Sequence, residues 1–218
     1  MTDSPQDVRI PAGSVVLEGL LGVPAGARGV VLFAHGSGSS RLSPRNAFVA
    51  RALRDAGIAT LLFDLLTAEE SEDRALVFDV ELLGGRLRAA TEWVRGAPAT
   101  SALPVGYFGA STGAAAALIA AADDPAIAAI VSRGGRPDLA RRVLARVRAP
   151  TLLIVGGEDA PVIGMNEDAL ARLRCAKRLA IVSGATHLFE EPGALEQVVR
   201  LATDWFRQHF PAQPRERR

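Results

Sequence analysis

Short apolar runs alternate with longer amphipathic stretches along almost the whole chain, and this alternation limits the fold more than any other feature. Each run is nearly continuous in apolar residues, which is typical of strands covered on both faces of a parallel sheet. The runs occupy residues 29–35, 58–66, 104–110, 127–135, 150–159 and 178–187. Strands and helices in strict alternation predict an α/β fold: a mostly parallel, doubly wound sheet with right-handed crossovers and helices on both faces.

The stretches between the runs show helical spacing of their apolar residues. Ser43-Pro44 provides an N-cap and a first-turn proline for a helix that ends at Gly57, and Asp138 is placed to cap another. The same helical spacing predicts further helices over residues 79–95, 112–124, 138–147, 166–174 and 193–209. The acid-rich segment 68–78 interrupts the pattern, and we interpret it as a solvated loop.

The two ends of the chain differ from the alternating part. Residues 1–28 predict one or two antiparallel strands with Gly and Pro at the bends, and residues 211–218 predict a frayed tail. No repeat or low-complexity linker is visible between them. We therefore expect residues 1–218 to form a single domain, with no large lid inserted between the strands.

Composition excludes several classes of function. A net charge of +1 gives no field that would attract nucleic acid or a membrane surface. Cys175 is the only cysteine, so no internal disulfide forms, and the three histidines lack metal-ligand spacing. The N-terminus has no signal-peptide pattern, and no apolar run is long enough to span a bilayer. We expect a soluble, cytoplasmic protein without metal, cofactor, nucleic-acid or membrane partner; the sequence does not determine its oligomeric state.

The stretch GASTG, residues 109–113, places Ser111 between two glycines at the end of one predicted strand. One interpretation is a nucleophile on a sharp strand-to-helix turn, which presents the hydroxyl above the sheet and requires small neighbours for steric reasons. The other is a serine that only caps the following helix. In a chain with 21 glycines the pentapeptide alone does not decide between them.

Two further residues favour the nucleophile. His187 ends the last predicted strand in GATH, and Asp159 follows the preceding strand in GGED, so both are expected at the edge of the sheet where Ser111 lies. The order Ser111, Asp159, His187 is the order of a catalytic triad built on such a sheet. The neighbouring Glu158 could supply the carboxylate instead, although Asp159 fits better, and His187 could also be a core or surface histidine.

An acyl-transfer site also needs donors for the developing oxyanion. HGSGSS begins at His35, where the first long strand ends, and its glycines allow backbone N–H groups to turn toward the site. The backbone N–H groups of Ser37 and Thr112 are the predicted donors. We interpret His35 itself as structural.

Together, GASTG, HGSGSS, GGED and GATH resemble α/β-hydrolases of the dienelactone hydrolase type, over about residues 15–210. The resemblance implies ester hydrolysis through an acyl-enzyme. The founding dienelactone hydrolases carry a cysteine nucleophile where this chain has Ser111, which favours a general carboxylesterase acting on small soluble esters. A thioesterase or lactone hydrolase with the same triad remains an alternative, and so does a silent binding protein with this fold.

Three arginines are candidates for binding a carboxylate on the substrate through a bidentate contact. Arg133 and Arg136 follow the strand next to the GASTG strand, and Arg41 follows the HGSGSS loop. The other interpretation is that these side chains are solvated or paired with the acid-rich segment.

Overall fold

The computed structural model describes residues 4–211, and its centre is one eight-stranded sheet with the order β1-β2-β4-β3-β5-β6-β7-β8. The strands are β1 Gln6–Ala12, β2 Val15–Gly22, β3 Val30–Ala34, β4 Ala59–Phe63, β5 Val105–Ala110, β6 Ile127–Arg133, β7 Thr151–Gly156 and β8 Lys177–Val182. Strands β1 and β2 are antiparallel, and β3 to β8 are parallel to one another. All six predicted parallel strands and the antiparallel N-terminal pair are therefore confirmed. Most of the predicted frayed tail, residues 212–218, lies outside the described residues.

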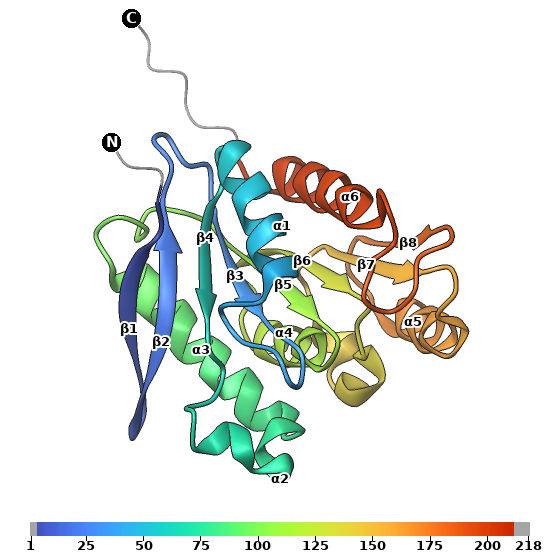
Figure 1. The fold of residues 1–218 in the computed structure, drawn as a ribbon, viewed down its shortest axis with the longest axis horizontal. Coiled ribbons are helices and arrows are strands. Elements are labelled where there is room, and N and C mark those ends of the chain that lie inside the picture. The colour runs from blue at the N-terminus through green and yellow to red at the C-terminus, as the bar shows by residue number, and fades with distance from the viewer. Residues whose placement is uncertain (1–3, 212–218) are drawn as a thin grey trace, which may run out of the picture.

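Helices cover both faces of the sheet (Figure 1). On one face lie α1 Pro44–Asp55 and α6 Ala194–His209, and on the other lie α3 Val80–Gly96, α4 Thr112–Ala122 and α5 Ala160–Arg172. The expected cap of α1 forms, since the Ser43 hydroxyl accepts the N–H of Asn46. Helix α4 is buried along nearly its whole length, and its alanines allow it to lie close against the sheet.

Two predictions about local structure were wrong. Residues 138–147 form no α-helix but two short 3₁₀ turns, η2 Pro137–Ala140 and η3 Leu144–Arg146. The physical reason lies in Asp138, whose carboxylate is bound by Arg136 and does not cap the segment. The segment 68–78 is more than a solvated loop, because it contains η1 Glu70–Glu72 and the short helix α2 Arg74–Val77. Its Glu70 carboxylate pairs with the mostly buried Arg86 of α3.

The strand order places a crevice at one edge of the sheet. From β3 the chain continues to β4 on one side and, later, to β5 on the other, so the order reverses between β3 and β5. In open parallel sheets, ligands bind beyond the carboxyl ends of the strands at such a reversal. The residues that follow β3, β5, β7 and β8 at this edge include His35, Ser111, Asp159 and His187. Within residues 4–211 no inserted lid domain covers the edge, and no helix there is long and apolar enough to cross a membrane.

Candidate active site

Ser111 occupies a strained turn between β5 and α4. Its backbone φ is 49° and its ψ is −121°, a conformation that a non-glycine residue rarely adopts and that is retained where the surroundings enforce it. The N–H of Ser111 donates to the carbonyl of Arg133 at 3.3 Å, and its own carbonyl accepts the N–H of Arg136 at 3.0 Å. The hydroxyl makes no capping hydrogen bond to α4. This observation speaks against a serine that only caps the helix.

The glycines of the GASTG turn are required by close backbone packing. A Cβ atom at Gly113 would overlap the carbonyl oxygens of Ala34 and His35, and one at Gly109 would overlap the backbone of Ala114. The turn therefore draws strand β5, helix α4 and the end of β3 together. The position of Ser111 follows from this packing of backbone against backbone.

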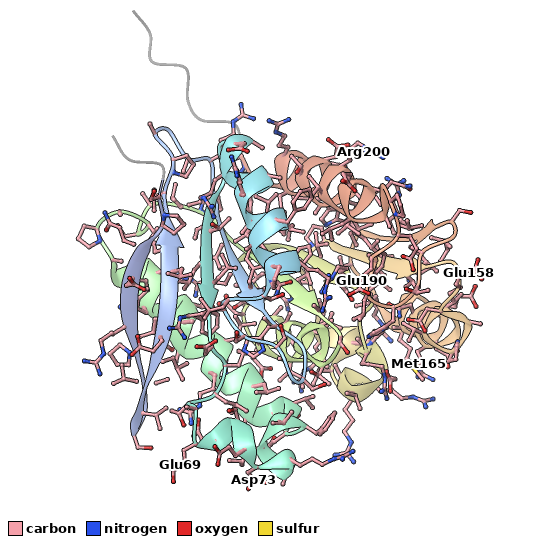
Figure 2. All side chains as sticks on the ribbon, viewed as in Figure 1. Glu69, Asp73, Glu158, Met165, Glu190 and Arg200 are labelled. Atoms are coloured by element: carbon pink, nitrogen blue, oxygen red, sulfur yellow. The ribbon has the colours of Figure 1, made fainter. Side chains whose placement is uncertain are left out.

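His187 and Asp159 form a direct hydrogen bond. The distance from His187 Nδ1 to Asp159 Oδ2 is 2.6 Å, and the Asp159 side chain is only 14% exposed. A carboxylate on Nδ1 holds the proton there and leaves Nε2 as the free basic nitrogen of the ring. The alternative carboxylate, Glu158, is exposed and lies at the periphery of the molecule (Figure 2).

Ser111 and His187 lie on two sides of the turn that follows β6. The Arg133 carbonyl holds the Ser111 N–H, and a Cβ atom at the next residue, Gly134, would lie 3.5 Å from His187 Cε1. Among the described residues no hydrogen bond joins Ser111 Oγ to the imidazole. Catalytic hydrogen bonds of this kind often tighten only when the substrate binds.

The two residues predicted to supply oxyanion donors, Ser37 and Thr112, are in contact, and the Ser37 N–H is already used in a hydrogen bond. The N–H of Ser37 donates to the side-chain Oγ1 of Thr112 at 3.0 Å. Thr112 is the first residue of α4, where a helix leaves its backbone N–H groups without intrahelical partners and offers a positive dipole end. The role of the Ser37 N–H as a direct donor to substrate stays a prediction.

His35 is a structural residue, as interpreted from the sequence. Its Nε2 accepts the N–H of Leu65 at 3.1 Å, so its proton resides on Nδ1, which lies 3.0 Å from the carbonyl of Gly36. Burial lowers the pKa of the His35 imidazole below its ordinary value. The neutral ring thus ties the loop after β3 to the end of β4.

The structure separates the three candidate arginines. Arg41 is paired with Asp64, whose carboxylate also accepts the Arg41 backbone N–H at 2.7 Å. Arg136 binds Asp138 through two nitrogens, at 2.9 and 2.8 Å, which raises the pKa of Arg136. Neither arginine pairs with the acid-rich segment 68–78, and both already hold a carboxylate.

Arg133 is different, because it is buried without a carboxylate partner. The residue is 8% exposed, and its Nε and Nη1 atoms have no hydrogen-bond partner among the described residues. Its guanidinium lies over the ring of Phe189, 5.9 Å from the centroid. Burial, with a smaller effect from the charge of Arg45, lowers the pKa of Arg133 to about 10, so the group keeps its charge at neutral pH.

A cavity of about 540 Å³ opens beside the oxyanion loop. It lies between strand β2, the loop after β3 and the segment after β4. Its apolar lining includes Leu17, Leu65, Leu66, Val77 and Leu83, and its polar lining includes Ser37 and Thr112. Across residues 4–211, no group of three or more His, Cys, Asp or Glu side chains is arranged to hold a metal ion.

Sequence reasoning missed the cavity, the Arg41–Asp64 pair and the contact made by the Thr112 hydroxyl. Asp64 carried a signal, since it directly follows β4 and so reaches the same edge as the other site residues. The Thr112 contact had no such signal, because it joins residues 75 positions apart in the chain.

The chain is similar to known proteins in sequence and in fold. The family model described as "Dienelactone hydrolase family" matches residues 17–210. A dienelactone hydrolase from Anabaena variabilis is 58% identical, with a TM-score of 0.92 over 95% of this chain and 100% of that chain. An α/β serine hydrolase without lid from Xanthomonas campestris, 23% identical, has a TM-score of 0.78 over 98% of this chain and 99% of that chain, and shows the same fold.

A curated relative from Mycobacterium tuberculosis is 59% identical over 206 residues, which are 94% of this chain and 46% of the relative. That relative is provisionally named as a phosphoribosyl transferase, and the present chain spans about half its length. The family match covers most of the chain, and the fold agrees with it. The chain has the α/β-hydrolase fold and belongs to the dienelactone hydrolase family.

Proposed function

We propose that the protein is a serine hydrolase that cleaves small carboxylic esters through an acyl-enzyme. The observation that carries the proposal is the 2.6 Å hydrogen bond between Asp159 and His187, which lie at the same sheet edge as the strained turn at Ser111. A serine needs a base that is itself oriented by a third group before it becomes nucleophilic. These three residues supply those roles.

The reaction follows from the roles of the side chains. Ser111 Oγ forms a bond to the ester carbonyl carbon while its proton passes to His187 Nε2. The tetrahedral intermediate then collapses, and the leaving alcohol takes the proton from the imidazolium, which Asp159 stabilises. Water repeats the cycle on the acyl-enzyme and releases the acid.

Cavity size supports a small substrate. A volume of about 540 Å³ lies within the range of small-molecule sites, and its leucine and valine lining suits an apolar acyl or alcohol group. A thioester or a lactone would use the same residues, so the leaving group is the part of the proposal that a substrate panel must determine.

A fluorophosphonate probe tests the proposal directly, because it reacts only with an activated serine. We expect the wild-type protein to be labelled at Ser111 and the Ser111→Ala variant to stay unlabelled. A wild-type protein that resists the probe while remaining folded would instead indicate a silent binding protein.

We also propose that Arg133 binds a carboxylate carried by the substrate. Of the three candidate arginines, it is the one whose guanidinium pairs with no carboxylate among the described residues, and its buried Nε and Nη1 have no hydrogen-bond partner there. A buried cation without a counter-ion is costly, and a bidentate carboxylate would satisfy it. Its backbone carbonyl accepts the N–H of Ser111, so the two residues are neighbours at this turn.

The test compares a neutral and a carboxylate-bearing ester, p-nitrophenyl butyrate and mono-p-nitrophenyl succinate. A hydrogen bond to a charged group contributes about 1.5–3 kcal/mol, so Arg133→Met should reduce the kcat/KM preference for the succinate roughly 10- to 150-fold. Arg136→Ala, which removes an arginine already bound to Asp138, is the matched control and should leave the preference unchanged. An equal preference in wild type and Arg133→Met would remove this proposal.

A further inference from the structure

The Thr112 hydroxyl has an unusual position, because it meets the predicted oxyanion donor. Ser37 donates its N–H to Thr112 Oγ1 at 3.0 Å, so the hydroxyl oxygen lies where that N–H points. A threonine hydroxyl can accept two hydrogen bonds and donate one. Here Thr112 Oγ1 accepts one hydrogen bond, from Ser37, and the acceptor for its own proton remains to be identified.

No protein group takes that proton among the residues the structure describes. The contact with Ser37 is the one hydrogen bond that the Thr112 side chain makes there. The residue is 3% exposed, and it lines the cavity beside the oxyanion loop. A buried donor without an acceptor is costly, so this O–H is suited to an acceptor that enters the cavity.

Resting on the proposed esterase function, we propose that the Thr112 side chain is itself an oxyanion donor. When Ser111 Oγ bonds to the carbonyl carbon, the carbonyl π bond breaks and its electron pair moves to the oxygen. The Thr112 backbone N–H and its Oγ1–H both donate to that oxygen, and neither proton is transferred. The Ser37 N–H fixes the orientation of the hydroxyl by donating to Oγ1.

This arrangement differs from an oxyanion hole made of two backbone N–H groups. A hydroxyl that accepts from one N–H becomes a better donor, since hydrogen bonds in a chain polarise one another. The N-terminus of α4 adds its positive dipole end at the same place. Ser37 then acts as a positioning residue, and the Thr112 hydroxyl touches the reacting oxygen.

A competing explanation predicts the opposite effect of the Thr112 hydroxyl on the reaction rate. If Ser37 N–H contacts the oxyanion directly, the Thr112 hydroxyl occupies its place and must leave during the reaction. Removing the hydroxyl would then free the N–H and leave the rate equal or higher. Thr112→Ala separates the two explanations, because alanine keeps the backbone N–H but lacks the O–H and leaves no side-chain atom in front of the Ser37 N–H. A valine methyl would still cover that N–H.

We expect both Thr112→Ala and Thr112→Val to lower kcat for p-nitrophenyl butyrate by about 10²–10³-fold, the usual loss for one oxyanion donor, with KM little changed. The rate of fluorophosphonate labelling should fall with it. Thr112→Ser, which keeps the hydroxyl, should retain kcat within about tenfold of wild type. A Thr112→Ala variant with kcat equal to or above that of wild type would overturn the inference.

Two controls keep the result interpretable. Thr203 on α6 is also a buried threonine whose hydroxyl has no partner among the described residues, and Thr203→Val should leave kcat unchanged. If Thr112→Val does not fold, the pair Thr112→Ser and Thr112→Ala differs by the hydroxyl alone, and equal kcat values in that pair would refute the inference. A folded wild type inert to both ester and probe would refute the proposed function as well, whereas an active wild type restricts the failure to Thr112.

Discussion

The GASTG turn and the loop after β3 meet at the same point of the sheet edge, but they are held in different ways. The turn is fixed by backbone packing, since side chains at Gly109 and Gly113 would overlap neighbouring backbone atoms. The loop has room around Gly38, where a Cβ atom would meet nothing within 4 Å. Excluded volume therefore specifies the turn, whereas the loop depends on hydrogen bonds beyond Gly36, where a Cβ atom would lie only 3.0 Å from Ser111 Cβ.

Side chains far apart in the sequence hold the loop. His35 connects it to Leu65, Arg41 connects it to Asp64, and Thr112 accepts the N–H of Ser37. Each of these contacts is a hydrogen bond or an ion pair. A substitution can therefore remove it without forcing atoms to overlap. We therefore expect substitutions in the turn to lower the stability of the whole fold by a large amount. Substitutions in the loop should lower it less, and at His35 the loss should depend on pH.

The largest effect on this comparison should come from Gly113→Ala. The added methyl would overlap the carbonyl oxygens of Ala34 and His35, so strand β3 and helix α4 would have to separate. We expect a loss of at least about 4 kcal/mol in the free energy of unfolding, because the overlap involves backbone in the core. For a domain of this size that corresponds to a fall of about 8–16 °C in Tm. A Tm within about 2 °C of wild type in a calorimetric scan would show that the turn can accommodate the added methyl.

His35→Gln should have a smaller effect that depends on pH. Burial holds the pKa of the folded imidazole below its ordinary 6.5, so below that pH the unfolded chain binds a proton that the folded chain resists. The contribution of neutral His35 is complete above about pH 6.5 and decreases as the pH falls below it. The variant should lose about 1–3 kcal/mol at pH 7.5 and show a flatter decrease in stability toward pH 5. Urea unfolding at several pH values measures both; parallel curves for the two proteins would contradict the role given to His35.

Gly38→Ala should have the smallest effect. The φ of Gly38 is +70°, a left-handed conformation that costs an alanine about 1 kcal/mol, and no neighbouring atom stands in the way of the methyl. We expect Tm to fall by about 2–4 °C, with esterase activity retained. A loss as large as that of Gly113→Ala would mean that the loop is packed as tightly as the turn and would abolish the distinction between them.

The contrast between backbone packing and polar contacts also explains which features could be predicted from the sequence. Apolar runs and glycine spacing are local, and they predicted six parallel strands and the strained turn at Ser111. The positions of Ser111, Asp159 and His187 at the ends of three predicted strands predicted the edge at which they lie, and the structure adds the hydrogen bond between the last two.

Polar partners were less predictable, because they depend on competition between acceptors. Asp138 was expected to cap a helix, yet Arg136, two residues before it, takes its carboxylate, and the segment forms 3₁₀ turns. The three arginines looked alike in the sequence, and nearby carboxylates distinguish Arg41 and Arg136 from Arg133. Such outcomes depend on which groups the folded chain brings within reach of one another.

The most direct test of the account is hydrolysis of p-nitrophenyl acetate, butyrate and octanoate by the wild type and by Ser111→Ala. The loss of a triad nucleophile typically lowers kcat by about 10⁴–10⁶-fold. We predict hydrolysis of the acetate and the butyrate by the wild type and a rate near background in the variant, and the octanoate rate measures how long an acyl chain the site accepts. Equal rates in the two proteins would contradict the central claim that Ser111 is the nucleophile.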